Sequence, residues 1–223
     1  MGDRVATGTQ AHEHSPAHPL ERLIFFSDAV FAIAITLLII EIHPPHLPYG
    51  TPVREQVAAF AKVAPQFIGF LISFGVIGAF WVGHHRSFSL ARHWSPRLLF
   101  PNLALLCAIA VMPFTTAYMN ANMWQLVPTV FYGSVLLATA LLNIWLVRRV
   151  TAPPVVAEEA DGLVLARTRA RGWAVAGGAA LSILVAFIEP ILSQPSLATI
   201  PIWLRLTVRR AERRYAAAQS AEG

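Results

Sequence analysis

Six apolar stretches alternate with shorter polar segments along the chain. The first lies within residues 22–41, and its apolar part at 23–40 is long enough for a membrane-crossing helix, which needs about 20 residues. The sixth is the weakest, because two prolines interrupt it. We therefore predict an all-α, polytopic membrane protein with six transmembrane helices per subunit, the later ones at 67–82 after an amphipathic lead-in at 53–62, then at 98–118, 126–147, 173–188 and 191–206.

The composition agrees with a membrane protein. The 223 residues are 56% hydrophobic and 13% charged, whereas soluble chains carry about 25% charged residues. The net charge of +5 does not indicate a nucleic-acid partner, because the basic residues lie mostly at the ends of apolar stretches, where they set topology. If both termini are cytoplasmic, every Lys and Arg except Arg54 and Lys62 lies on the cytoplasmic side, and this asymmetry predicts that orientation.

Three regions follow from this pattern. Residues 1–20 are polar and predict a disordered cytoplasmic N-terminus, residues 21–208 form the six-helix transmembrane domain, and residues 209–223 form a basic cytoplasmic tail. No cleavable signal peptide is evident, so we expect the first apolar stretch to remain in the mature protein. The single cysteine, Cys107, excludes a disulfide within the chain.

The first helix has two polar features on an apolar background. At about 100° per residue, its aliphatic side chains form one stripe with Phe26 below it and Thr36 beside it, and Asp28 lies about 140° away from that stripe. A carboxylate within a spanning helix costs a few kcal/mol, so it usually faces the protein interior and has a function. Periodicity alone favours ordinary helix packing as the reason for the stripe, whose members are Val30, Ile33, Leu37 and Ile40.

Asp28 is expected to belong to a network with residues of the first three helices that lie at the same depth. Ser27 and Asp28 could simply cap a helix start, but a buried network that ties the first helix to the second and third accounts for more of the residues. Its expected members are Arg22, Phe26, Ser27, Asp28, Trp81, His84, His85 and Asn102. His84 and His85 could titrate or bind a metal, yet no further ligand accompanies them, and we predict a hydrogen-bonded structural pair and no metal site.

Three stretches in the first half of the chain resemble the transmembrane protein 175 family, the lysosomal and bacterial potassium channels. The resemblance rests on an RxxxFSD element at 22–28, a Trp-x-x-His-His-Arg element at 81–86 and an Asn-Leu … Pro-Phe pair at 102–114. Ala29 departs from it, since many bacterial members carry Gly there. The single RxxxFSD copy resembles the bacterial branch, which implies the plasma membrane of a bacterium.

The resemblance implies a homotetramer around a central pore lined by the first helix. It places Ile33 at the narrowest ring, with Thr36, Leu37 and then Ile40 beyond it. The implied function is a potassium-permeable cation channel, not an enzyme, with a hydrophobic constriction that gates by dewetting. Its partners are then other copies of itself, the lipid bilayer and monovalent cations, and it needs no cofactor besides the permeant K⁺.

Two other functions stay open at this point. One is a proton-coupled secondary transporter that uses Asp28 and His84/His85; the other is a non-conducting membrane scaffold. Paired broken helices would favour the transporter, and the sequence shows none. Motifs for hydrolysis or phosphate binding and the TVGYG-type carbonyl filter are absent from the sequence.

Overall fold

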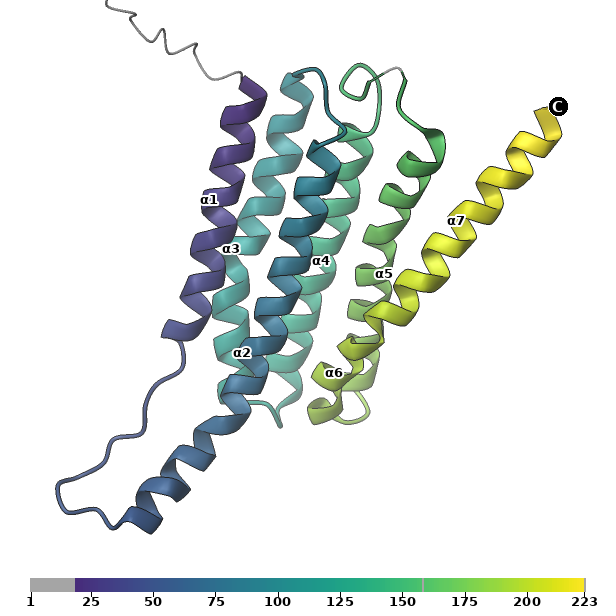
Figure 1. Ribbon diagram of the computed structural model, residues 1–223. Helices are drawn as coiled ribbons and strands as arrows, with labels where there is room; N and C mark the ends of the chain where they lie inside the picture. The colour runs from purple at the N-terminus through teal and green to yellow at the C-terminus, as the bar shows by residue number, and fades with distance from the viewer. Residues whose placement is uncertain (1–18, 158, 223) are drawn as a thin grey trace, which may run out of the picture.

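The computed structural model describes residues 19–157 and 159–222, and this part of the chain is helical throughout (Figure 1). It contains no strand, only an isolated bridge between Ala91 and Val156, so the all-α prediction is confirmed. The elements in chain order are α1 (Pro19–Ile40), α2 (Val53–Phe88), the 3₁₀ turn η1 (Pro96–Leu98), α3 (Leu99–Ala121), α4 (Leu126–Val150), α5 (Gly162–Ala186), α6 (Pro190–Ser196), the 3₁₀ turn η2 (Leu197–Thr199) and α7 (Ile200–Glu222).

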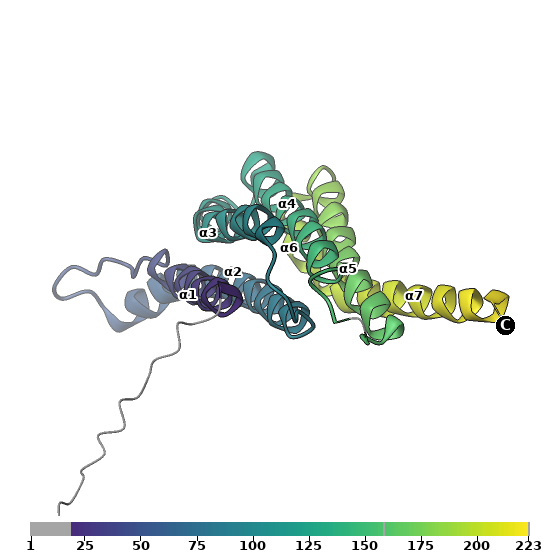
Figure 2. The same ribbon diagram turned by 90° about the horizontal axis from the view of Figure 1, so that it is seen from above.

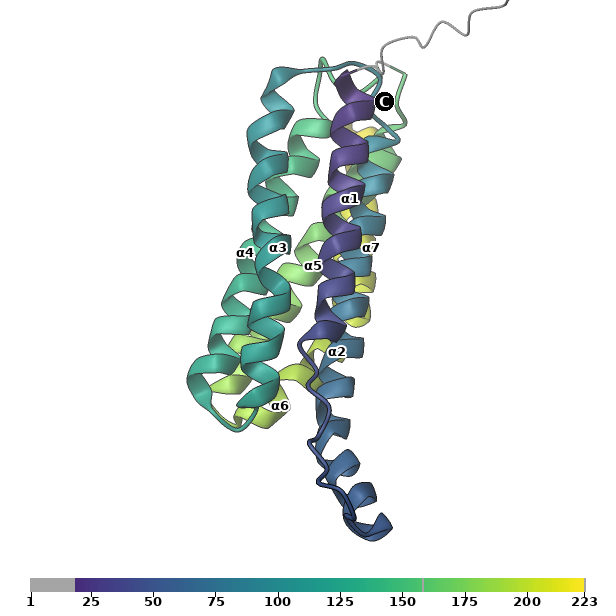
Figure 3. The same ribbon diagram turned by 90° about the vertical axis from the view of Figure 1, so that its left-hand side faces the viewer.

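The six long helices run up and down, and the start of α1 and the end of α7 lie at the same end of the bundle (Figures 1 and 3). Within the described residues, four helical segments are long and apolar enough to cross a membrane: α1, α2, η1 with α3, and α4. α5 and α7 complete the bundle, but both carry arginines. Most arginines of the described residues lie toward the end that holds both chain ends, whereas Arg54 and the single lysine, Lys62, lie in the first part of α2 at the other end.

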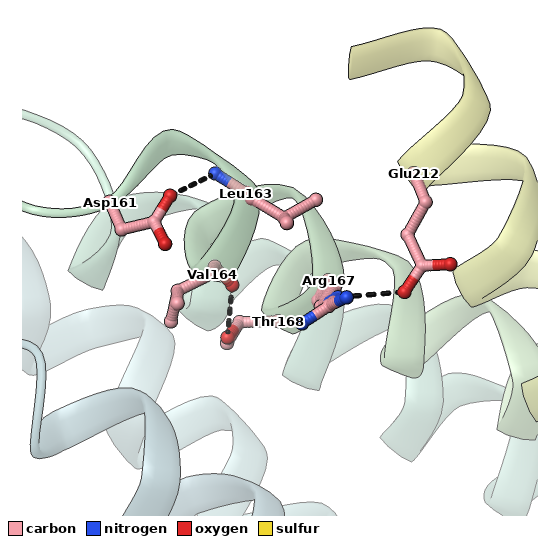
Figure 4. Close-up of polar contacts among 6 residues, drawn as sticks. All are labelled: Asp161, Leu163, Val164, Arg167, Thr168 and Glu212. Atoms are coloured by element: carbon pink, nitrogen blue, oxygen red, sulfur yellow. Dashed lines mark hydrogen bonds and ion pairs between the residues drawn. The ribbon is translucent and has the colours of Figure 1, made fainter. Parts of the chain in front are cut away.

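The last two long helices differ from their predicted bounds. α5 begins at Gly162 instead of residue 173, because the Asp161 carboxylate accepts a hydrogen bond of 2.8 Å from the Leu163 backbone N–H and caps the helix (Figure 4). The expected sixth span at 191–206 is broken into α6, η2 and α7, since proline cannot donate a backbone hydrogen bond.

The expected limits of the membrane domain fall within helices. α7 continues without a break across the expected limit between residues 208 and 209, so the basic tail is part of a helix. α1 begins at Pro19, and proline is well suited to a first helical turn. The remainder of the predicted N-terminal region, residues 1–18, lies outside the described residues.

The core lies around α3 and α4. In the most apolar 18-residue stretch of each of these two helices, half of the residues are buried within the chain. The buried share of the corresponding stretch is 33% in α2 and only 28% in α1. Seen from above, α1 and α2 lie on one side of α3 and α4, and α5 and α7 lie on the other (Figure 2). A single subunit therefore leaves most of the surface of α1 uncovered.

Glycines set the close spacing of α4, α5 and α7. A Cβ added at Gly178 of α5 would lie 2.5 Å from Cγ1 of Ile200, and one added at Gly172 would lie 2.6 Å from Cγ1 of Ile144. Gly133 of α4 faces Ile183 in the same way, at 2.8 Å. Such small residues let helix backbones approach closely in membranes, where packing and not the hydrophobic effect holds helices together.

A cleft of about 670 Å³ separates α2 from α4 and α5. Three glycines of α2, namely Gly75, Gly78 and Gly83, line its near side, and an added Cβ at any of them would meet nothing within 4 Å. Contacts between α2 and α5 are sparse, whereas α5 packs extensively on α4 and on α7. The cleft beside α2 is called the open seam below.

We predict that Gly178→Val lowers the midpoint of thermal unfolding, measured in detergent, by several degrees. Inserting methyl groups into a well-packed contact costs about 1–3 kcal/mol, and the Ile200 side chain stands directly against this position. The matched control is Gly75→Val in α2, where space is open. Equal midpoints for the two variants would contradict the spacing role assigned to Gly178.

Candidate functional site

A buried chain of hydrogen bonds joins α1, α2 and α3 near the end of the bundle that holds both chain ends. The Asn102 Nδ2 amide of α3 donates to Ser27 Oγ of α1 over 2.9 Å, and Asn102 Oδ1 lies 2.9 Å from Nε2 of His84 in α2. Ser27 Oγ in turn donates to the Leu23 carbonyl at 2.8 Å. Ser27, His84 and Asn102 are fully buried, so these bonds replace water that cannot reach them.

This geometry fixes the tautomer of His84. Because the Asn102 amide nitrogen donates to Ser27, its oxygen faces His84 and can only accept, so Nε2 of His84 carries a proton and donates. The other ring nitrogen, Nδ1, has no hydrogen-bond partner among the described residues. The ring lies between Phe31 and Phe88, with centroid distances of 5.5 and 4.4 Å. His84 is thus a buried structural group whose Nε2–H is paired with Asn102.

A second link joins α1 to α2 at the same level. The indole Nε1 of Trp81 donates to Asp28 Oδ1 over 2.9 Å, and the His85 ring stacks on Trp81 at a centroid distance of 6.0 Å. Of the donors that the sequence offered to Asp28, Trp81 is the one that reaches it. The two histidines therefore belong to different contacts, since His84 faces the core and His85 is exposed.

Two expected members of the network lie elsewhere. Arg22 is exposed at the start of α1, and Phe26 is 52% exposed. Both lie outside the hydrogen-bonded chain of the described residues.

Three of the four residues of the aliphatic stripe of α1 face away from its own bundle, and the fourth, Val30, is half-buried against the core. Ile33, Leu37 and Ile40 are 58%, 40% and 67% exposed, whereas the opposite face of α1 is buried against α2 and α3. Thr36 is also exposed, and its hydroxyl proton is taken by backbone carbonyls, with Oγ1 at 2.9 Å from the Ile33 oxygen and 3.1 Å from the Ala32 oxygen. The lone pairs of Thr36 Oγ1 remain free to coordinate a cation.

A further polar cluster went unpredicted. Thr116 Oγ1 of α3 donates to Ser73 Oγ of α2 over 2.9 Å, and Ser73 lies 3.2 Å from the hydroxyl of Tyr132 in α4. All three are buried. The only hint in the sequence is that the three hydroxyls lie at a common depth. This hint is not sufficient, because Ser and Thr often bond to the backbone of their own helix instead of to each other.

The described residues hold no group of three or more metal-ligating side chains that could bind an ion. The site therefore positions α1. The Ser27–Asn102–His84 chain and the Trp81–Asp28 bond, together called the clamp below, fix one face of α1 to α2 and α3, and the other face stays bare. The fold and this clamp define a multi-pass membrane protein whose first three helices form one unit.

Comparison with known proteins identifies the family. A model of the family described as the endosomal/lysosomal potassium channel TMEM175 matches residues 22–113. A potassium channel of Chamaesiphon minutus is 34% identical over 144 residues, which cover 63% of this chain and 70% of that protein. A potassium channel of Streptomyces collinus is 36% identical over 124 residues, which cover 54% of this chain and 59% of that protein.

The fold comparison reaches further along the chain. The crystal structure of a lysosomal potassium-selective channel TMEM175 homolog from Chamaesiphon minutus superposes with a TM-score of 0.70 at 28% identity, covering 85% of this chain and 97% of that one. The chain belongs to the TMEM175 family, which confirms the resemblance seen in the sequence. The family match spans α1, α2 and most of α3, and so includes both the clamp and the bare face of α1.

We predict that Asn102→Leu lowers the thermal unfolding midpoint of the purified protein. The substitution leaves the buried Nε2–H of His84 without an acceptor, which costs about 1–3 kcal/mol. Asn122→Leu is the matched control, because the Asn122 side chain bonds only to the Tyr118 carbonyl at the exposed end of α3. If Asn102→Leu has the same midpoint as the control, the hydrogen bonds of Asn102 do not stabilise the bundle.

Proposed function

We propose that this chain is a potassium-permeable cation channel of the bacterial plasma membrane, in which four copies surround a pore lined by α1. Its relatives' names and the fold match support the potassium channel. The observation that carries the pore assignment is the two-sided character of α1. One face is fixed by buried hydrogen bonds to α2 and α3, while Ile33, Leu37 and Ile40 project from the other.

The assembly follows from what one helix can enclose. A single α1 cannot surround an ion path, so the pore requires several copies related by cyclic symmetry. α1 also has the smallest buried share of the four apolar spans, 28% over its most apolar 18 residues. Placing the bare stripe at a shared axis covers that surface and aligns equivalent residues in rings.

In such an assembly Ile33 forms the narrowest ring. A ring of isoleucine side chains holds no water when narrow, so it works as a hydrophobic gate and penalises ions that must shed their hydration shell. Potassium sheds water at lower cost than sodium, which gives a modest preference for potassium. Ile40 forms a second ring about 10 Å along the helix.

Thr36 supplies the polar counterpart to these rings. Its hydroxyl proton is held by the helix backbone, so the oxygen presents lone pairs and no proton to the axis. Four such oxygens would replace part of the water that a cation loses. Leu37 closes the apolar wall beside them.

The basic end of the bundle gives the orientation. Arg148, Arg149 and the arginines in the second half of α7, Arg213 and Arg214, lie toward the end that holds both described chain ends, and we assign that end to the cytoplasm by the positive-inside rule. Arg54 and Lys62 of α2 then lie toward the other side.

We predict that Ile33→Asn raises potassium flux into liposomes several-fold and brings the potassium-to-sodium permeability ratio close to one. A polar ring stays wet, so neither ion has to dehydrate fully. The control is Ile39→Asn, which is also exposed on α1 but lies off the stripe. Flux and selectivity unchanged in Ile33→Asn would move the constriction away from Ile33.

The same liposomes distinguish a channel from a carrier. Downhill flux that does not saturate with potassium concentration is expected of the channel. Flux that saturates or requires a pH gradient would favour the proton-coupled transporter and shift attention to Asp28, His84 and His85.

We further predict that native mass spectrometry of the purified protein counts four copies per particle. A monomer would contradict the central pore, because α1 would then have no partner helices to form rings with.

A further inference from the structure

A groove of about 1230 Å³ runs between α4, α5 and α7, on the side of the subunit away from α1 (Figures 1 and 2). α7 forms one wall, presenting Trp203, Thr207, Arg210 and Arg214 at helical spacing along a single face. α4 and α5 form the floor. The groove uses none of the residues assigned to the pore or the clamp.

The helix register brings basic residues from three helices to one level. α5 and α7 run antiparallel, and contacts pair Gly162 with Tyr215 at one end and Gly178 with Ile200 at the other. Midway, the Arg167 guanidinium bonds Glu212 at 2.7 Å (Figure 4). This register sets Arg169 level with Arg210, and the α4–α5 contact of Ile144 with Gly172 brings Arg148 to the same height.

The charge at this level is unbalanced. Four arginines line the groove, namely Arg148, Arg169, Arg210 and Arg214, and no described carboxylate lines it. The Glu212 carboxylate on α7 is engaged by Arg167 and is not part of the lining. Arg169 is bound to the Thr151 hydroxyl at 2.8 Å, whereas Arg210 and Arg214 are exposed and make no hydrogen bond within the described residues.

The remainder of the groove is apolar. Below the arginines, toward the other end of the bundle, it is lined by Leu137, Leu141, Ala176, Gly177, Ala180 and Trp203. Trp173 lies between the two zones, and the Arg148 guanidinium sits 5.8 Å from the centre of its ring. Tryptophan and arginine in this order are typical of the depth where lipid headgroups meet acyl chains.

We propose that this groove binds an anionic phospholipid. Its phosphate lies among Arg148, Arg210 and Arg214, and one acyl chain follows the apolar floor past Leu141 and Leu137. Basic pockets between membrane helices bind phospholipid headgroups in this way, and arginine suits phosphate because its planar guanidinium donates two parallel hydrogen bonds.

A second copy of this chain is a poorer occupant. The chain carries 12 acidic residues against 17 basic ones, so another copy brings little negative charge to four clustered arginines. An acyl chain also matches the long apolar floor, which a charged protein segment does not.

The test measures thermal unfolding of the purified full-length protein in detergent with added palmitoyl-oleoyl phosphatidylglycerol or phosphatidylcholine. We expect phosphatidylglycerol to raise the midpoint and phosphatidylcholine to leave it unchanged. In Arg210→Gln/Arg214→Gln the phosphatidylglycerol concentration needed for half the shift should increase about 30-fold, since each basic residue near a lipid surface contributes comparably to binding.

Arg209→Gln/Arg213→Gln is the matched control, with the same loss of charge on the same helix but at positions that do not line the groove. It should keep the wild-type response. If both double variants weaken the response equally, the effect is general surface charge and the proposal fails. If the Arg210/Arg214 variant does not fold, Arg148→Gln in α4 provides the same comparison.

Two further outcomes would overturn the proposal. An equal shift from inorganic phosphate at the same phosphate concentration would assign the arginines to a free anion instead of a lipid. A changed subunit count in Arg210→Gln/Arg214→Gln, with an unchanged response to phosphatidylglycerol, would assign the groove to contact between copies.

Discussion

A polar group inside an apolar bundle must find its hydrogen-bond partner on another helix, and this constraint determines how the first half of the chain is arranged. Ser27, Asn102 and His84 satisfy one another across α1, α3 and α2, and a buried group left unpaired would cost about 1–3 kcal/mol. Any slip of α1 along its axis or rotation about it breaks at least one of these bonds. The same bonds that stabilise the bundle therefore determine which face of α1 stays outside.

The choice of which face of α1 stays outside connects the fold to the proposed ion conduction. The buried face of α1 carries the small side chains of Ser27 and Ala34 between large apolar ones. The free face carries the aliphatic stripe, which can line a pore only when α1 helices of several copies of the chain come together. The clamp is thus remote from the ion path but orients it, because the direction of Ile33 follows from the direction of Ser27 on the same rigid helix.

The first half of the structure was largely readable from the sequence, because both helix faces and residue depth follow from regular spacing. Depth placed Trp81, the two histidines and Asn102 near Asp28, and of these Trp81 is the donor that reaches it. The second half was less readable. Arg167, Arg169 and Arg171 resemble a loop in a hydropathy profile, yet they lie in α5, where a capping bond at Asp161 starts the helix early. The pairing of Ser73 with Thr116 and Tyr132 depended on neighbours that no local pattern identifies.

The open seam between α2 and α5 makes the subunit unequally stiff. Glycine contacts hold α4, α5 and α7 at fixed spacing, and hydrogen bonds hold α1, α2 and α3 together. Between α2 and α5, Gly75, Gly78 and Gly83 face empty space, while α3 and α4 pack extensively and join the two groups of helices through the core. Packed helices move by small sliding steps where few contacts must be broken, so α2 slides past α5 at a lower cost than α3 slides past α4. The seam therefore gives the subunit a local compliance beside a stiff core.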